Sequence, residues 1–352
     1  MVPEPARGAL PPTSPRRWLQ YAVSLVLTVL FLYVAFRGTD PADIAASLDN
    51  ANYWWLFWYL VALIVSHLFR ALRWRYMLYP IKPDIGLRNL FSAVMIGYML
   101  NNVLPRAGEL GRPFAIGKLE QISAGASFGT IVVERIMDMI SFLILVAALP
   151  FLYRGPLLES FPWLAQSGIV LAAVIILATA SMVALMLRRD WADAVLARAT
   201  RLFPERFASR IERLTHSFLD GFSFLKSPQH FVIIGVLSVL VWGLYAVMTW
   251  CGLQAFGLEA SLGFSGAIVV LAISSIGVAI PTPGSTGTYH AFASQTLIAL
   301  YGVDRATALS FATLTHGVGF VSVTLIGLYY FLKDKVTFGD AMRSRRPDTG
   351  GR

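Results

Sequence analysis

The sequence predicts an all-α polytopic membrane protein. Of its 352 residues, 56% are hydrophobic and only 14% are charged, and the mean hydropathy is +0.63. Soluble domains carry a much larger share of charged residues. Apolar runs long enough to cross a bilayer recur along the chain. The net charge of +9 is therefore better explained by membrane topology than by nucleic-acid binding, and we expect no nucleic-acid partner.

Two polar interruptions of the apolar pattern organise the predicted fold. The first elbow is Pro105–Gly111 and the second elbow is Pro281–Gly287, and both have the pattern Pro-x-x-Gly-x-x-Gly. Each elbow lies between two apolar arms, and a Ser-Phe pair then opens a long span, at Ser127-Phe128 and at Ser310-Phe311. Two such elbows in corresponding places indicate an internal repeat.

The apolar pattern predicts two inverted repeats, each built as span, span, re-entrant hairpin and span. The first repeat is predicted for residues 18–152 with its hairpin at 90–118, and the second for residues 153–332 with its hairpin at 264–302. Together they give six full spans and two re-entrant hairpins. Inverted repeats with helices broken near the middle of the membrane are typical of alternating-access transporters. Non-helical backbone at that depth is tolerated where protein or a water-filled cavity surrounds it.

Three segments fall outside the predicted spans. The proline-rich residues 1–17 predict a disordered tail. Residues 188–230 carry apolar side chains at steps of three and four, which predicts an amphipathic helix on the membrane or over the bundle. Residues 333–352 predict a basic cytoplasmic tail.

The distribution of Lys and Arg predicts the orientation in the membrane. With re-entrant hairpins, the outer segments contain only Arg37, Arg154 and Arg305, and most other cations fall on the inner side. Cytoplasmic segments are enriched in Lys and Arg. We therefore expect a cell (inner) membrane protein with both termini and residues 188–230 in the cytoplasm.

The first elbow carries Arg106, Glu109 and Arg112. Pro113 suits the first turn of a helix, so the return arm is expected to start near Arg112 with its N-terminal N–H groups aimed at the elbow. Helix N-termini and arginine both bind phosphate well. The alternative is that Gly and Pro only turn the chain while the arginines reach the interface.

The third span carries a polar stripe. Ser127, Thr130, Glu134, Asp138 and Ser141 follow at steps of three and four, with Arg135 beside them. Two carboxylates at this depth must face the bundle interior. They would line a headgroup or cation path, or form a structural ion-pair network with nearby arginines, and both roles remain open.

The second elbow offers hydroxyl groups and a histidine. Its candidate substrate-binding residues are Pro281, Gly284, Ser285, Thr286, Gly287 and His290. A lone histidine in a membrane more often serves structure than proton transfer, but His290 is placed next to the elbow. The two elbows are expected to approach to roughly 15 Å or less, about half the hydrocarbon thickness, and to share one cavity with Arg106, Glu109, Arg112, Glu134 and Asp138.

Signals of catalysis are weak in this sequence. It shows no metal-ligand spacing, nucleophile motif or phosphate-binding loop, and the single cysteine, Cys251, excludes a disulfide framework. We therefore predict a protein that is not an enzyme and that uses no metal or cofactor.

Four motifs resemble the lysylphosphatidylglycerol synthase/flippase transmembrane family, the membrane half of the multiple peptide resistance factor. They are Arg70–Arg75, Leu104–Leu110, Val133–Asp138 and Pro281–Gly287, and the resemblance runs from about residue 18 to residue 332. It implies that a lipid moves between leaflets. Two residues depart from the family pattern: Ser285 replaces a glycine, and His290 stands where a glutamate is usual.

The hypothesis that follows is a flippase for a phosphate-bearing lipid, such as a phospholipid, an aminoacyl-phospholipid or a polyprenyl-linked lipid. The alternatives are a small-solute secondary transporter, a membrane-embedded transferase, and a non-catalytic partner of a lipid-synthesis enzyme. The expected partners are the bilayer, its lipid substrate, and a lipid-biosynthesis enzyme or a second copy of the chain.

Overall fold

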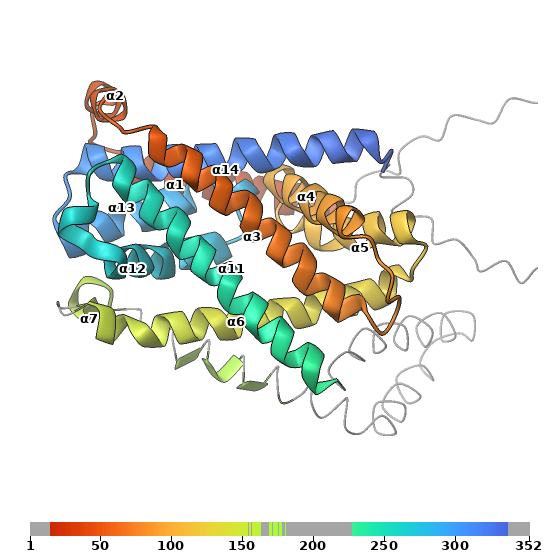
Figure 1. Cartoon of the computed structure of the whole chain (residues 1–352). Helices are drawn as coiled ribbons and strands as arrows, with labels where there is room; N and C mark the ends of the chain where they lie inside the picture. The colour runs from red at the N-terminus through yellow and green to blue at the C-terminus, as the bar shows by residue number, and fades with distance from the viewer. Residues whose placement is uncertain are drawn as a thin grey trace, which may run out of the picture.

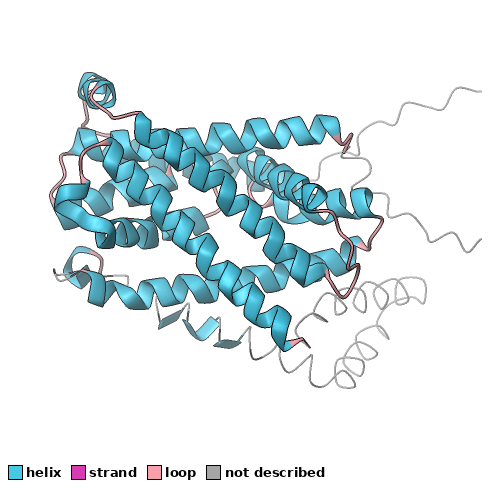
Figure 2. Ribbon diagram, viewed as in Figure 1, coloured by secondary structure: helices cyan, strands magenta, loops and turns pink. Residues whose placement is uncertain are grey.

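The regular elements are all helices in the part of the chain that the structure describes (Figures 1 and 2). This computed structural model describes residues 15–153 and 227–336, with short pieces between 155 and 180. The all-α prediction is confirmed there. Most of the expected tail, most of the span predicted for residues 168–187, residues 188–226 of the amphipathic segment and the basic tail beyond residue 336 lie outside the described residues.

The helices follow one another in two groups. The first group is α1 (Pro15–Phe36), α2 (Pro41–Asp49), α3 (Trp54–Leu78), α4 (Leu87–Val103), α5 (Ala107–Glu120), α6 (Ala124–Leu152) and α7 (Leu157–Ser160). The second group is α11 (Pro228–Ala255), α12 (Glu259–Ala279), the short 3-10 helix η2 (Pro283–Ser285), α13 (Thr288–Tyr301) and α14 (Arg305–Lys333). α3 and α11 pack side by side through the middle of the molecule (Figure 1).

Four described helices are long and apolar enough to cross a membrane, namely α3, α11, α12 and α14. α1 and α2, bent by 79° at a short break, give a fifth candidate if they count as one span. α6 has 29 residues but carries Glu134, Arg135 and Asp138 within its apolar sequence. The described chain therefore supports four or five spans, and the six that the sequence predicts are not established by it.

The first elbow turns more sharply than the sequence predicts. Leu104 is extended, as expected for a residue before proline, and Arg106 takes a left-handed conformation with φ 60°. α5 therefore begins at Ala107, and Pro113 lies inside the helix. The expected start near Arg112 is wrong, because the turn is completed by Arg106 immediately after Pro105.

The second elbow is held by its own backbone and hydroxyl groups. Gly284, Ser285 and Gly287 all have positive φ, between 56° and 85°. The hydroxyls of Thr282 and Thr288 lie 3.1 Å apart and close the turn. α12 leads into this elbow, and its helix is broken at Gly263 (φ 63°), one residue before the predicted hairpin.

The second elbow lies against the end of α4. The Asn102 amide donates to the Thr324 hydroxyl at 2.8 Å and to the Phe320 carbonyl at 3.2 Å, both on α14. A Cβ atom on Gly284 would lie 3.1 Å from Oδ1 of Asn102. Asn102 precedes Pro105 by three residues, so the second elbow contacts the helix that leads into the first elbow, and the direct approach of the two elbows stays a prediction.

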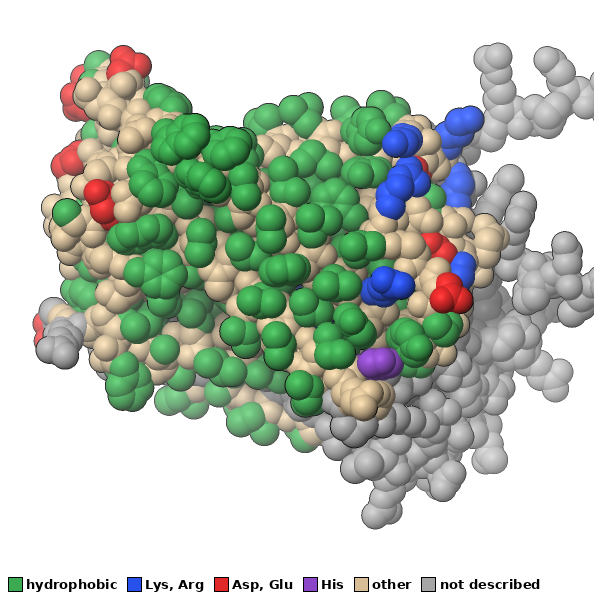
Figure 3. All heavy atoms as spheres, in the orientation of Figure 1, with side chains coloured by type: hydrophobic (Ala, Val, Ile, Leu, Met, Phe, Trp, Pro, Cys, Tyr) green, Lys and Arg blue, Asp and Glu red, His purple; other side chains and the backbone are tan. Residues whose placement is uncertain are grey.

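The surface has the character of a membrane protein. Figure 3 shows a broad apolar face between an end with acidic residues and an end with Lys and Arg. The acidic end lies over α2, and the Lys and Arg side chains gather at the opposite end together with a few acidic ones. Large apolar side chains such as those of Val26, Trp54 and Leu325 are more than half exposed, as lipid-facing positions require.

Candidate functional site

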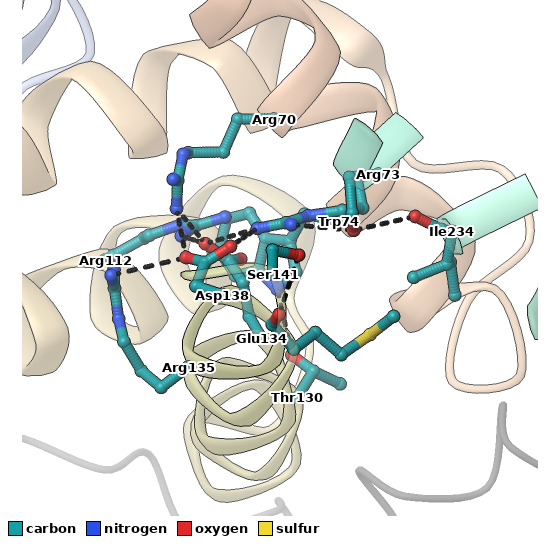
Figure 4. A network of polar contacts seen from close by, with 12 residues as sticks. Arg70, Arg73, Trp74, Arg112, Thr130, Glu134, Arg135, Asp138, Ser141 and Ile234 are labelled. Atoms are coloured by element: carbon teal, nitrogen blue, oxygen red, sulfur yellow. Dashed lines mark hydrogen bonds and ion pairs between the residues drawn. The ribbon is translucent and has the colours of Figure 1, made fainter. Parts of the chain in front are cut away.

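Charged side chains gather in the interior where α3, α5 and α6 come together. Figure 4 shows them pointing toward one another. The charge cluster consists of Arg70 and Arg73 from α3, Arg112 from α5, and Glu134, Arg135 and Asp138 from α6. Glu134 and Arg73 are fully buried, and Arg70 and Arg112 nearly so. Charges this deep in an apolar bundle make the cluster the candidate functional site.

Glu134 is the centre of the charge cluster. Its Oε1 atom lies 2.6 Å from Nη1 of Arg70 and 2.9 Å from Nη1 of Arg112. Nη2 of Arg73 lies 3.4 Å from the same oxygen. One carboxylate oxygen thus holds guanidinium groups from two different helices.

Asp138, one turn further along α6, pairs with two of these three arginines, Arg70 and Arg73. Its Oδ2 lies 3.0 Å from Nη1 of Arg70, and its Oδ1 lies 2.8 Å from Nη2 of Arg73. Arg135, on the same helix, lies 3.5 Å from Oδ2 of Asp138. The spacing of four residues between Glu134 and Asp138 puts both carboxylates on the face of α6 that meets α3.

Neutral side chains fix the guanidinium groups. Arg70 donates to the hydroxyl of Tyr245, and Arg73 donates to the hydroxyl of Ser238, each at 2.9 Å. Both partners lie on α11. Arg112 lies over the ring of Trp74 at 3.9 Å from its centroid, a favourable position for a cation on an aromatic face.

The charge cluster carries more positive than negative charge. Its four arginines face two carboxylates, and Glu109 reaches only Arg135, at 3.6 Å and one-third exposed. Several donors within it have no hydrogen-bond partner among the described residues, and they include Nε of Arg70, Nε of Arg73, and Nε and Nη2 of Arg112. Buried donors are normally satisfied. An anion could accept from these donors, whereas Oε2 of Glu134, which also has no partner among the described residues, would need a donor.

The structure brings together only part of the site that the sequence predicts. Arg112, Glu134, Arg135 and Asp138 lie in the charge cluster, with Glu109 at its edge. Arg106 is exposed at the elbow, and the described residues give it no ion pair with the cluster. The N-terminal N–H groups of α5 are also occupied, since Gly108 donates to Oδ1 of Asn101 at 2.7 Å.

Arg70 and Arg73 are the residues that the sequence argument did not place in the site. Both belong to the Arg70–Arg75 motif, which was not among the candidate substrate-binding residues. Their spacing could have identified them as interior residues, because Arg70, Arg73 and Trp74 lie on one face of a helix while Arg75 points elsewhere. Arg73 is fully buried, whereas Arg75 is half-buried.

The second elbow forms a separate group. The Nε2 atom of His316 lies 2.8 Å from the carbonyl oxygen of Gly284, and His290 packs against His316. Thr288 donates to the carbonyl of Ser285 at 3.1 Å. Pro281, Gly284, Ser285, Thr286, Gly287 and His290 all belong to this group or its turn. Among the described residues, no hydrogen bond or ion pair joins them to the charge cluster.

A cavity of about 440 Å³ lies elsewhere, between α2 and the start of α14. Its lining includes Asp40, Asp43, Asp304 and Arg305 and none of the predicted site residues. Asp40 and Asp304 cap the helices that follow them, so this cavity reflects how the helix ends meet. It gives the predicted common cavity no support.

The fold and the buried cluster define a multi-pass α-helical membrane protein. The chain belongs to the family described as the lysylphosphatidylglycerol synthase TM region, which it matches over residues 19–327. The resemblance that the motifs indicate is thereby confirmed.

The chain is also similar to archaeal proteins named UPF0104 membrane proteins. One, from Methanothermobacter thermautotrophicus, is 24% identical over 326 residues, which cover 87% of this chain and 93% of the relative. Another, from Methanocaldococcus jannaschii, is 21% identical over 86% of this chain and 92% of the relative. A third, from Pyrococcus horikoshii, is 24% identical over 77% of this chain and 84% of the relative. The family match over residues 19–327 includes both elbows and the charge cluster.

Proposed function

We propose that this protein is a translocase that moves a phosphate-bearing lipid between the leaflets of the cell membrane and is not an enzyme. The observation that carries the proposal is the excess of positive charge in the buried cluster. Four guanidinium groups share two carboxylates, and several of their donors have no partner in the described chain. A phosphate group would supply both the missing charge and the missing acceptors.

The carboxylates have a definite part in this proposal. An unpaired cation buried in an apolar region is strongly destabilising. Glu134 and Asp138 hold the arginines in place when the site is empty, so the site is formed before the lipid arrives. They also compete with the phosphate for the guanidinium groups, which favours release on the other side. A translocase needs binding that is strong enough for entry and weak enough for departure.

The arrangement of the hairpins supports alternating access. Figure 1 shows α4 and α5 toward one end of the molecule and α12 and α13 toward the other. Both hairpins break at a Pro-Gly elbow, and Gly284 of the second elbow lies against Asn102, three residues before the first elbow. We propose that they belong to inverted repeats of the predicted kind, with six spans in all. Such repeats place the substrate near the middle of the membrane.

A small-anion transporter is the second candidate, because the same charge excess would suit a soluble anion. A lipid-biosynthesis enzyme that delivers the lipid, or a second copy of the chain, is the proposed protein partner. The lipid and soluble-anion candidates differ in one measurable property. A lipid translocase changes the leaflet of a labelled phospholipid in sealed vesicles, whereas an anion transporter changes only the soluble content.

Replacing Arg112 with Lys is expected to slow movement of a fluorescent phosphatidylglycerol in proteoliposomes by about tenfold to a hundredfold. Lysine keeps the positive charge but lacks the planar guanidinium group of Arg112. That group contacts Glu134 through Nη1 and has Nη2 free for a phosphate. The loss of one charge-assisted hydrogen bond, about 1.5–3 kcal/mol, corresponds to that factor. Movement is measured as the fraction of label accessible to dithionite over time.

Arg37→Lys is the matched control, because Arg37 is exposed near the end of α1 and should leave the rate unchanged. Arg106→Ala distinguishes a phosphate site at the tip of the first elbow from a phosphate site in the charge cluster. A rate as slow in Arg106→Ala as in Arg112→Lys would place the phosphate at the elbow tip. An unchanged rate in Arg112→Lys would contradict a role for the charge cluster in transport.

The proposed orientation puts both termini and residues 188–230 in the cytoplasm. In a Cys251→Ala background, Ala45→Cys on the exposed surface of α2 should react with an impermeant maleimide added to intact cells. Thr200→Cys should react only after the membrane is opened, because cytoplasmic segments carry the excess of Lys and Arg. Labelling of Thr200→Cys alone in intact cells would reverse the orientation.

A further inference from the structure

The second elbow contains a pair of histidines that the proposed lipid site does not use. His290 lies two residues after the start of α13, and His316 lies on α14. Their ring centroids are 4.8 Å apart and their planes are inclined at 64°. His290 is only 5% exposed. Two imidazoles so close together inside an apolar bundle suggest that at least one of them changes its protonation state.

Each ring is tied to a different residue of the elbow. A carbonyl oxygen can only accept, so His316 donates its Nε2 proton to Gly284 at 2.8 Å. The backbone N–H of Gly287 points at Nδ1 of His290 at 3.4 Å. Nδ1 of His290 must therefore be without a proton in this arrangement. The pair thus holds both glycines of the elbow, one through a donor and one through an acceptor.

The residues that the histidines hold are contact points with other helices. Gly284 lies against Asn102 of α4, as described above. A Cβ atom on Gly287 would lie 2.7 Å from the carbonyl oxygen of Thr28 on α1, so α1 packs directly on the elbow backbone there. A change at the histidines would be transmitted to the first hairpin through Gly284 and to α1 through Gly287.

The neighbourhood of the pair holds few other titratable groups. Tyr289 stacks on His316 and donates to the Thr315 hydroxyl, and Tyr59 of α3 donates to the carbonyl of Thr315. Phe36 of α1 contacts the ring of His290, and Phe320 contacts the ring of His316. Asn102 of α4 lies against Gly284, and Gly277 of α12 lies against Thr288 and Phe292. No carboxylate or arginine is in contact with either ring among the described residues.

We infer that His290 and His316 form a proton-binding site that couples proton movement to motion of the second elbow. A proton taken from water onto Nδ1 of His290 turns the acceptor of the Gly287 N–H into a second donor, and the two N–H groups then oppose each other. The new positive charge also lies in the first turn of α13, where the helix dipole disfavours a cation. Protonation therefore favours an elbow in which the Gly287 N–H has turned away from His290, and this movement changes how Gly287 packs on α1.

The inference rests on the proposed translocase function, for which it supplies a source of energy. Two adjacent imidazolium ions repel each other, so the pair accepts one proton at a time. A proton that binds when the elbow opens to one side and leaves when it opens to the other links a proton gradient to the direction of lipid movement. The charge cluster holds the lipid, and the histidine pair sets when the elbow moves.

Cysteine labelling of the elbow tests the proton site without any transport measurement. Thr286→Cys is introduced into the full-length protein in a Cys251→Ala background, and its reaction with a maleimide is followed between about pH 5.5 and pH 7.5. Rates are divided by those of Ala45→Cys, which corrects for the reactivity of the thiol itself. Since a proton that binds one state only changes a two-state ratio by up to about tenfold per pH unit, we expect the corrected rate to rise about tenfold or more toward low pH.

The variants are chosen to keep the hydrogen bonds and remove the titration. His290→Asn retains an acceptor near the position of Nδ1, and His316→Gln retains a donor near the position of Nε2. Both should give a flat corrected rate while eluting as folded protein. His230→Asn, which alters a histidine packed against Tyr79 near the start of α11, should leave the titration intact. A flat rate in the parent, or a titration that survives in both elbow variants, would overturn the proton site.

Lipid movement under an imposed pH gradient then separates this inference from the proposed function. We expect the gradient to change the rate severalfold in the parent and not in His290→Asn. Lipid movement that ignores both the gradient and His290→Asn would overturn the coupling and leave the translocase intact. Absence of lipid movement under every condition would overturn the translocase, while the labelling titration would still decide whether the histidines bind a proton.

Discussion

Replacing Glu134 with Gln is expected to lower the free energy of unfolding by about 3–5 kcal/mol, the range found when one partner of a buried ion pair is removed. Glutamine has almost the same shape, so packing is retained. It leaves Arg70, Arg73 and Arg112 around a neutral amide, and Asp138 is then the remaining carboxylate buried in the charge cluster. The loss is large because a single oxygen of Glu134 serves all three guanidinium groups.

Thermal unfolding of the purified protein in detergent measures this effect. Glu120→Gln is the matched control, since Glu120 pairs with Lys82 at 2.6 Å and accepts from Asn89 at 2.7 Å. The Lys82 side chain is 37% exposed, so water screens that pair and the expected loss is about 1 kcal/mol or less. Glu120 is itself buried, but the Lys82 side chain that pairs with it is not.

A double substitution shows whether the effect of Glu134 is electrostatic. Arg112→Met together with Glu134→Gln removes one charge of each sign, so the excess of positive charge returns to that of the parent. We expect the double variant to be more stable than Glu134→Gln alone by about 1 kcal/mol or more, within the usual range for coupled neighbours. Equal stability of the two variants would mean that the charge balance of the cluster does not govern folding.

The elbows could be located from sequence because their signal is local. Proline disfavours helix in the residue before it, and glycine permits positive φ, so Pro105 and Pro281 with their following glycines define turns without any tertiary information. The polar face of α6 was predictable for the same reason. Glu134 and Asp138 are one turn apart, and a helix with two carboxylates on one face must direct that face into the bundle and away from lipid.

The partners of those carboxylates were not predictable in the same way. Which arginines reach Glu134 depends on how α3 and α5 pack against α6, and that packing joins residues more than 60 positions apart, as in Arg70–Glu134. The positive-inside rule assigns Arg70 and Arg73 to the cytoplasmic surface of the membrane. The left-handed Arg106 also moved the start of α5, so Arg112 lies inside the helix and turns toward the cluster while Arg106 stays exposed.

Replacing Gly108 with Ala is expected to lower the free energy of unfolding by at least about 3 kcal/mol and to abolish lipid movement. A Cβ atom at this position would lie 1.9 Å from the carbonyl oxygen of Gly97, at the crossing of α4 and α5. Overpacking usually costs about 1–3 kcal/mol where side chains can move aside. Here the obstacle is backbone, so α5 must shift as a whole. Arg112 follows one turn later on α5, and its ion pair with Glu134 moves with the helix.

Two further glycine substitutions make the prediction specific. A Cβ atom on Gly97 would approach the side chain of Arg112 at 3.3 Å, and one on Gly235 of α11 would meet nothing within 4 Å. We therefore expect Gly97→Ala to cost less than Gly108→Ala, and Gly235→Ala to change stability by no more than about 1 kcal/mol, the helix-propensity difference between the two residues. If Gly108→Ala is as stable as Gly235→Ala, the hairpin arms do not cross as described. In that case nothing fixes Arg112 within reach of Glu134, and the charge cluster would have to be assembled by α3 and α6 alone.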